Sequence, residues 1–161
     1  MTVWRMTMRV SPSGFDLWQE CKRGGVAAIA YRPMAGVDLA RFDEGEPREK
    51  WLTLKPAQRG FLKRIAYEMK KGDMIYAKQG SKIVGRGVVT GGYRFDRKGK
   101  IKDPADPSLP YAHQVRVKWD ERFEELPIVL GADITTVLRL EGKRLKRLEA
   151  AIQRRKSRRK R

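Results

Sequence analysis

At 161 residues the chain has room for one domain with a modest core and a short extension. Its 37 Lys and Arg residues outnumber 19 Asp and Glu residues, and the net charge of +18 favours nucleic acid or another polyanion as partner. A single cysteine and a single histidine exclude an intrachain disulfide and argue against a metal site built from soft ligands. The apolar runs are too short to span a bilayer, and the N-terminus lacks the apolar region of a signal peptide. We therefore predict a cytoplasmic protein without membrane contact, metal or cofactor.

The first third of the chain alternates between short apolar segments and breaks. Trp4 to Val10 has the period-two pattern of a half-buried strand. Phe15 to Lys22 has the three- and four-residue apolar spacing of a helix, with Ser13 as a candidate cap. Val26 to Tyr31 is predicted to be a buried strand, and the polar segment Arg32 to Lys50 to be a binding loop or partly disordered.

A helix and a hairpin are predicted in the middle of the chain. Pro56 suits the first turn of a helix over residues 57–71, and Gly72 suits its end. Strands over residues 73–78 and 82–90 follow, the second interrupted by Gly85 and Gly87, which indicate a bulge, a barrel corner or the close approach of another group. The hairpin leads into a basic, aromatic loop, which fits either a stacking surface for nucleic acid or a plain surface hairpin with core aromatics.

The remainder is predicted to be a flexible loop over residues 96–110, a clear strand at Tyr111 to Trp119, and two short strands over 124–130 and 134–140. A helix begins at Gly142. Six or seven short strands with few helices predict a mixed α+β domain whose small sheet curls or closes into a barrel.

The sequence contains no group of residues typical of a catalytic site. The chain has no nucleophile motif, phosphate-binding loop or dinucleotide fingerprint. Its acidic residues do not form the cluster that a metal-dependent nuclease needs. We predict a protein that is not an enzyme and has no catalytic residues.

Aromatic residues are the better candidates for a binding site, because bases stack on aromatic rings. Trp18 and Trp119 fall on apolar faces and fit a core position, whereas Tyr31, Trp51 and Tyr93 border loops and fit either a pocket wall or the core. Phe95 and Tyr111 are further stacking candidates. Lys78, Gln79 and Gly80 could direct donors at a ligand or make an ordinary hairpin turn, and the single His113 faces inward on its strand, where most histidines are satisfied within the core.

The C-terminal segment concentrates the positive charge. Residues 141–161 carry eleven basic and two acidic residues, a net charge of +9. The stretch from Arg154 to Arg161 is expected to be disordered in isolation through self-repulsion and to bind phosphates without reading sequence, with a solubilising tail as the alternative. The predicted phosphate contacts are Arg94, Arg97, Lys98, Lys100, Arg154, Arg155, Lys156, Arg158, Arg159, Lys160 and Arg161.

Six motifs in order resemble the EVE domains of the PUA superfamily, relatives of YTH domains, and most closely the N-terminal modules of McrB-type restriction GTPases. The resemblance covers about residues 3–140. It rests on Trp4-Arg5-Met6, Leu17-Trp18 through Cys21, Gly25 to Tyr31, Phe61-Leu62 through Met69 to Asp73, Ile83 to Tyr93, and Pro110 to His113 with Val115 to Trp119.

The resemblance implies a PUA-like mixed barrel of about six strands, flanked by two or three helices, over residues 1–140, followed by a basic helix and tail over 141–161. It also implies a pocket that holds an extruded, modified base of DNA or RNA. Tyr31 stands where many relatives have tryptophan. The predicted pocket residues are Trp18, Tyr31, Trp51, Lys78, Gln79, Gly80, Tyr93 and His113.

The combined prediction is a non-catalytic reader of a nucleic-acid base, with the basic tail adding phosphate affinity. Two alternatives stay open. One is a PUA-like binder of structured RNA without selectivity for modified bases. The other is an adaptor that recruits a separately encoded nuclease or GTPase through the long loop or the tail.

Overall fold

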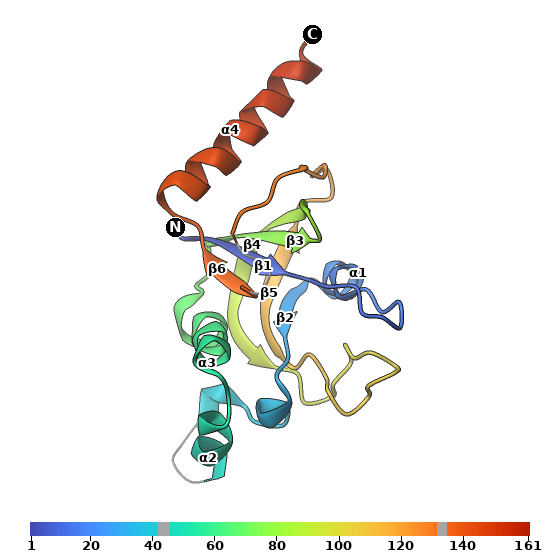
Figure 1. Cartoon of the computed structure of the whole chain (residues 1–161), viewed down its shortest axis with the longest axis vertical. Coiled ribbons are helices and arrows are strands. Elements are labelled where there is room, and N and C mark those ends of the chain that lie inside the picture. The colour runs from blue at the N-terminus through green and yellow to red at the C-terminus, as the bar shows by residue number, and fades with distance from the viewer. Residues whose placement is uncertain (42–45, 132–134) are drawn as a thin grey trace.

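A six-stranded mixed sheet forms the centre of the protein (Figure 1). This computed structural model describes residues 1–41, 46–131 and 135–161, with the backbone alone at 46 and 47. Residues 42–45 of the predicted long loop and residue 134 of the last predicted strand lie outside the described residues. The strands are β1 Val3–Thr7, β2 Val26–Ile29, β3 Met74–Gln79, β4 Lys82–Phe95, β5 His113–Trp119 and β6 Val137–Arg139, in the sheet order β2-β5-β4-β3-β1-β6.

The sheet pairs distant parts of the chain. β1 runs parallel to β3, with Trp4 opposite Ile75, and every other pairing is antiparallel. β4 is the longest strand and bends at register shifts near Gly91, which lets it curl around the core. The predicted α+β class with about six strands and flanking helices is confirmed. The sheet curls but does not close, because β2 and β6 remain as its edges.

Capping side chains, a proline and a glycine set several of the helix ends. In α1 (Leu17–Gly24) the Asp16 carboxylate caps the backbone N–H of Gln19, and Gly25 ends the helix at φ 64°. Pro56 opens α3 (Pro56–Lys63), as predicted, and a π-helical turn, η3 (Arg64–Glu68), follows directly. The other helical elements are the 3₁₀ turns η1 (Arg32–Met34) and η2 (Leu39–Arg41), α2 (Glu46–Leu52) and α4 (Gly142–Arg159).

Two predictions of secondary structure were wrong. The segment 32–50 is not a loop throughout, because η1, η2 and the start of α2 fall within it. Residues 124–130 form no strand. Only Leu126 bridges to Ile83, because Pro127 has no N–H to continue a ladder. In the folded protein the helix predicted from Gly142 continues through Arg159, where Arg155 and Arg159 pair with Glu124.

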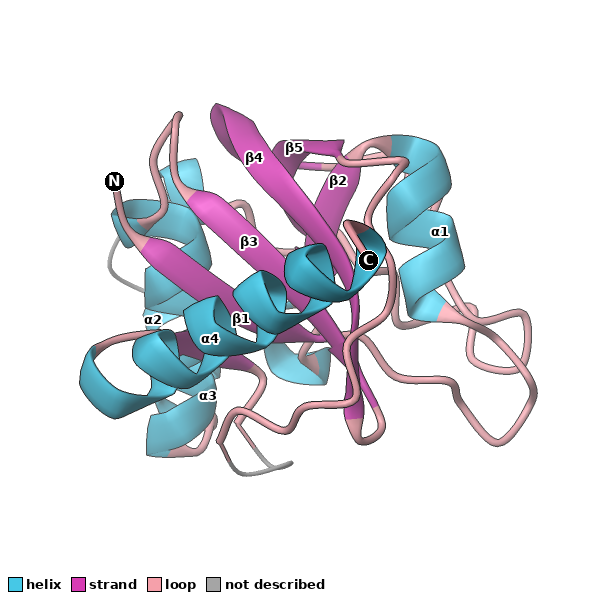
Figure 2. Cartoon of the chain, turned by 90° about the horizontal axis from the view of Figure 1, so that it is seen from above, coloured by secondary structure: helices cyan, strands magenta, loops and turns pink. Residues whose placement is uncertain are grey.

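Two apolar layers lie on the two faces of the sheet, because alternate residues of a strand point to opposite sides. Ile75 and Ala77 of β3 enter the larger core beneath α1 and α3. Tyr76 enters a smaller cluster with Leu148 of α4. Figure 2 shows α4 crossing β1 and β3, and Leu148 of this helix belongs to the second cluster. Burial of Leu148 therefore attaches the C-terminal helix to the domain.

A buried carboxylate joins the start of β1 to the turn before β3. Asp73 accepts hydrogen bonds from the Thr2 and Lys70 backbone N–H groups at 2.9 and 3.0 Å, and from the Trp4 indole at 3.0 Å. Burial alone would raise the pKa of Asp73, but the three donors outweigh it and lower the pKa.

We expect Asp73→Asn to lower the free energy of unfolding by about 2 kcal/mol at pH 7, because an amide NH₂ would face one of these donors. A carboxylate with a lowered pKa stabilises the fold above its unfolded pKa, and that stabilisation is lost as the pH falls through the lower folded pKa. The deficit of the variant should therefore shrink in urea unfolding at pH 3.

Asp106→Asn, at an exposed ion pair with Arg32, is the control and should change stability by less than about 0.5 kcal/mol. An equal deficit at both pH values would contradict the prediction.

Candidate functional site

A cavity of about 550 Å³ opens where β1, the end of β2 and the first turns of α3 meet. This volume lies within the range of small-molecule sites. Its walls are largely apolar, with three aromatic rings and several polar side chains at the edges. The lining residues are Thr7, Arg9, Leu17, Ala28, Ile29, Ala30, Tyr31, Lys55, Ala57, Gln58, Phe61, Tyr111 and Thr136.

Tyr31 forms the central wall of the cavity. Its ring stacks on Phe61 with centroids 6.4 Å apart and planes at 26°. The Tyr31 hydroxyl is buried and has no hydrogen-bond partner among the described residues. Burial raises the pKa of Tyr31, an effect that the neighbouring Thr136 side chain opposes without reaching hydrogen-bond geometry. The wall of the cavity thus includes a tyrosine whose neutral hydroxyl is buried and unsatisfied, which is costly unless a partner reaches it.

A second aromatic pair stands on another side of the cavity. Tyr111 stacks against Phe15 with centroids 6.0 Å apart and planes at 24°. Arg9 and Lys55 are exposed at the rim, and Gln58 accepts a hydrogen bond from the Lys55 backbone N–H at 2.9 Å. The site therefore combines flat apolar walls with cationic and amide groups at its opening.

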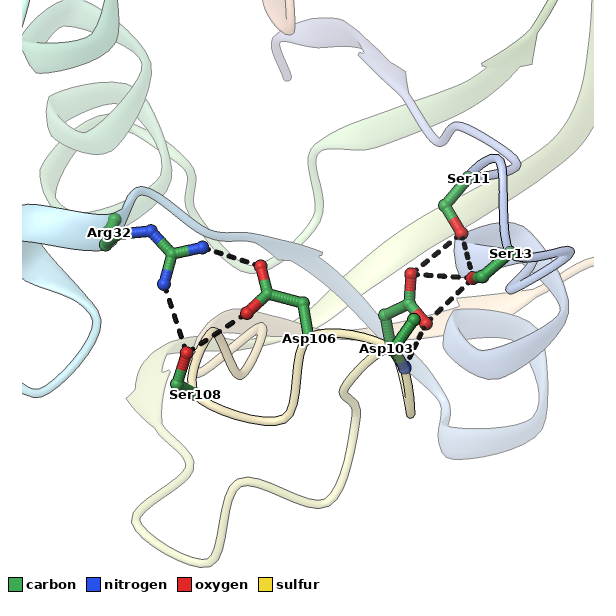
Figure 3. A network of polar contacts seen from close by, with 7 residues as sticks. Ser11, Ser13, Arg32, Asp103, Asp106 and Ser108 are labelled. Atoms are coloured by element: carbon green, nitrogen blue, oxygen red, sulfur yellow. Dashed lines mark hydrogen bonds and ion pairs between the residues drawn. The ribbon is translucent and has the colours of Figure 1, made fainter.

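The loop that precedes Tyr111 is held in place by two polar clusters (Figure 3). Asp106 pairs with Arg32, the residue after Tyr31, at 2.6 Å. Asp103 accepts hydrogen bonds from the Ser11 and Ser13 hydroxyls, each at 2.8 Å. The Ala105 backbone N–H, together with these hydroxyls, lowers the pKa of Asp103. The segment predicted to be flexible is irregular in structure but is tied to both sides of the cavity.

Residues 4–139 match the family model described as a domain of unknown function (DUF8426). The chain belongs to the DUF8426 family. No curated protein matches it.

Two solved structures are similar to this DUF8426 chain over most of its length. One is the NMR structure of Rpa0253 from Rhodopseudomonas palustris, with a TM-score of 0.46, 18% identity, and coverage of 94% of this chain and 92% of that one. The other is the crystal structure of the YTH domain of the Zygosaccharomyces rouxii MRB1 protein in complex with N6-methyladenosine RNA. Its TM-score is 0.43, its identity 11%, and its coverage 92% of this chain and 84% of that one. At these TM-scores neither likeness extends to function.

Of the eight predicted pocket residues of this DUF8426 chain, Tyr31 alone is among the described residues that line the cavity. Trp18 is 5% exposed in the main core, edge-on to Trp119 with centroids 4.8 Å apart. Trp51 lies on α2, half-buried against the same core, with the Lys63 ammonium 6.0 Å from its ring centre. The two tryptophans therefore stand apart from the cavity.

The residues around the hairpin turn also lie elsewhere. Lys78 is 1% exposed within β3. The Gln79 amide donates to the Met8 carbonyl at 3.0 Å and to the Asp16 carboxylate at 2.9 Å, which ties the hairpin to the start of α1. Gly80 adopts φ 59° in the turn, a conformation that favours glycine.

Tyr93 and His113 form a buried hydrogen-bond chain away from the cavity. His113 Nε2 lies 2.8 Å from the Met34 carbonyl, which can only accept, so this nitrogen carries the proton. His113 Nδ1 then accepts from the Tyr93 hydroxyl at 2.8 Å, and the Tyr93 oxygen accepts from the Leu39 N–H at 3.2 Å. The chain attaches η1 and η2 to the sheet.

The predicted phosphate contacts form two groups. Arg94 lies near the end of β4, and Arg97, Lys98 and Lys100 follow that strand; Arg97 pairs with Asp38 at 3.2 Å. The second group lies on α4 and just beyond it. Among the described residues, no cluster of three or more His, Cys, Asp or Glu side chains could hold a metal ion. No helix in the described part of the chain is long and apolar enough to cross a bilayer.

Sequence reasoning missed most of the cavity. Phe61 falls within the helix predicted over residues 57–71 but was not a pocket candidate, and it belongs to the core while also lining the cavity. Tyr111 was a stacking candidate but was not placed with Tyr31. Thr7, Gln58 and Thr136 carry no sequence signal, since they are ordinary polar residues brought together by folding.

Proposed function

We propose that this protein binds nucleic acid by holding one nucleobase in the cavity beside Tyr31. The observation that carries the proposal is a cavity with three aromatic walls and one buried, unsatisfied hydroxyl in a chain of net charge +18. Tyr31 and Phe61 are too close for a ring to slide between them, so the base would lie against their exposed face. Stacking of this kind contributes about 1–3 kcal/mol per base.

The Tyr31 hydroxyl would read an edge of the base. A buried hydroxyl without a partner costs about 1–3 kcal/mol, and a ring nitrogen or carbonyl of a base would satisfy it. Arg9 and Lys55 at the rim would contact the flanking phosphates. The basic groups around the end of β4 and on α4 would add affinity that falls with salt.

The EVE-like motifs motivate the finer proposal that the base is a modified one. We would measure binding to matched single strands and duplexes at about 0.2 M salt, carrying plain bases, 5-methylcytosine, 5-hydroxymethylcytosine or N6-methyladenine. We expect a preference of about tenfold or more for one modified base, which corresponds to about 1.4 kcal/mol. Equal affinity for all bases that still depends on Tyr31 would instead indicate a binder of nucleic acid without selectivity for modification.

Tyr31→Phe is the sharpest variant, because it removes only the hydroxyl. It should leave the stability of the free protein unchanged or slightly higher, since an unsatisfied buried group disappears. It should weaken binding about fivefold, or about 1 kcal/mol, whereas Tyr31→Ala should weaken it at least tenfold.

Tyr67→Ala is the matched control, since Tyr67 is 52% exposed on η3 and does not line the cavity. It should leave affinity within about twofold. Charge on the tail is best tested with Lys156→Ala and Lys160→Ala, because truncation at residue 141 would remove the buried Leu148. Binding that is insensitive to both Tyr31 variants but lost in the tail variants would overturn the base-binding proposal.

A further inference from the structure

A second hollow, with a volume of about 970 Å³, lies between α4 and the irregular segment 124–129. We call it the α4 groove, and it shares no lining residue with the cavity beside Tyr31. Its floor is apolar, made by Pro127, Ile128 and Val129 on one side and by Ala150 and Ala151 on the other. Val129 is 41% exposed, and the two alanines leave the floor open.

Arginines stand along this floor. Arg147, Arg154 and Arg158 are separated by seven and four residues, so they fall on one side of the helix. All three are exposed, and none has a hydrogen-bond or ion-pair partner among the described residues. Three guanidinium groups are therefore available beside exposed apolar surface.

Glu124 shows how the groove takes a carboxylate. One of its oxygens accepts a hydrogen bond from Nε of Arg155 at 2.9 Å and lies 2.8 Å from Nη2 of the same guanidinium. Arg159 pairs with the other oxygen. Hydrogen bonds between charged groups are stronger than neutral ones, and the arginine guanidinium suits carboxylates. Five arginines line the groove, and two of them, Arg155 and Arg159, thus pair with a carboxylate of the chain itself.

The floor argues for a peptide over a nucleic-acid strand. Phosphates need cations but no apolar surface, and bases need aromatic rings to stack on. None of the described residues lining the α4 groove is aromatic. An amphipathic acidic segment would match both features, with its apolar side chains against Ile128 and Val129 and its carboxylates on the three available arginines.

We propose that the α4 groove is a docking site for an acidic amphipathic segment of a partner protein. From Arg147 to Arg158 the helix rises about 17 Å, the length of about twelve helical residues. The occupant would be a short helix with apolar residues on one face and Asp or Glu on its flanks. This inference does not rest on the base held beside Tyr31, but it assigns Arg154 and Arg158 to carboxylates of the partner and leaves phosphate contacts on α4 to the other basic residues.

The test uses the full chain and labelled synthetic peptides of about 14 residues. One peptide carries Leu at helical spacing with Glu and Asp on the flanks, and a second has every Leu replaced by Ser at the same charge. A single-stranded oligonucleotide of equal charge is the third ligand. Binding would be followed by fluorescence anisotropy at about 0.15 M salt, where exposed charges are well screened.

Two triple variants carry the same change of charge. Arg147→Ala, Arg154→Ala and Arg158→Ala together should weaken the Leu peptide at least tenfold. Lys143→Ala, Lys146→Ala and Lys156→Ala, which lie outside the groove, should weaken it at most about twofold. Alanine keeps the helix intact, which circular dichroism would verify. Val129→Ser should weaken the Leu peptide about threefold and leave the Ser peptide unchanged.

Three results would overturn the inference. Equal losses in the two triple variants would show diffuse electrostatic binding. Equal affinity for the Leu and Ser peptides would show that the floor contributes nothing. In the third result, the oligonucleotide displaces the peptide, and its own affinity is lowered by the triple arginine variant and unchanged by Val129→Ser. That result would make the groove a nucleic-acid surface.

Discussion

Gly85→Ala is expected to lower the free energy of unfolding by about 3 kcal/mol or more. A Cβ at this position of β4 would overlap the ring of Trp18. That ring cannot retreat, because it packs edge-on against Trp119, whose indole N–H donates to the Cys21 and Val26 carbonyls at 3.2 and 3.1 Å. Thermal and urea unfolding would measure the loss.

Gly92→Ala is the matched control. Gly92 belongs to the same strand, and a Cβ there would meet nothing within 4 Å. Its substitution should change stability by less than about 0.5 kcal/mol. Trp18→Leu combined with Gly85→Ala should cost less than the sum of the two single changes, because they share one contact. A loss below about 1 kcal/mol for Gly85→Ala would show that the sheet and α1 can separate at little cost.

His113→Ala is expected to destabilise the protein by about 3 kcal/mol at pH 7.5. The side chain is fully buried, and its removal leaves a cavity and two unsatisfied groups, the Met34 carbonyl and the Tyr93 hydroxyl. Tyr93→Phe removes the two hydrogen bonds of the hydroxyl but leaves the ring in place, and it should cost about 1–2 kcal/mol. Equal stability of His113→Ala and the wild type would contradict the hydrogen-bond chain.

The buried His113 should also make the stability of the protein depend on pH. Burial lowers the pKa of His113, while the Met34 carbonyl and the Asp38 charge oppose the shift. A histidine with a lowered pKa contributes fully above its unfolded pKa of about 6.5. It loses that contribution as the pH falls, by at most about 1.4 kcal/mol per pH unit.

Because the chain has a single histidine, the comparison isolates that group. Wild-type stability should decline from pH 7 to 5.5, and His113→Ala should be flat over this interval. A parallel decline in both proteins would assign the pH dependence to another group.

Local pattern predicted much of the framework. The hairpin of β3 and β4, the strand β5 and the helix opened by Pro56 were all visible, because period two, period 3.6 and turn residues report on the local backbone. Gly85 was expected to mark a bulge or a close approach, and the close approach is that of Trp18. Tyr31 was correctly placed beside a loop at the end of a strand.

Long-range pairing was beyond the reach of those patterns. The parallel contact of β1 with β3 joins Trp4 to Ile75, and periodicity cannot show which of several apolar strands will meet. The helical course of Arg154 to Arg159 in the folded protein was beyond the local pattern for a similar reason. Its self-repulsion is local, whereas the pairing of Arg155 and Arg159 with Glu124 is tertiary.

In the candidate site, too, some features follow from the sequence and others only from the tertiary structure. Sequence alone determined a basic α+β domain with an aromatic at the end of its second strand, since composition and periodicity are properties of the chain. Tertiary structure decided that Tyr31 would meet Phe61, Tyr111 and Thr136 around one cavity, and that Tyr93 and His113 would bond to each other elsewhere. A cavity is the space left between elements after they pack, so its walls depend on how distant segments meet and no local pattern encodes them.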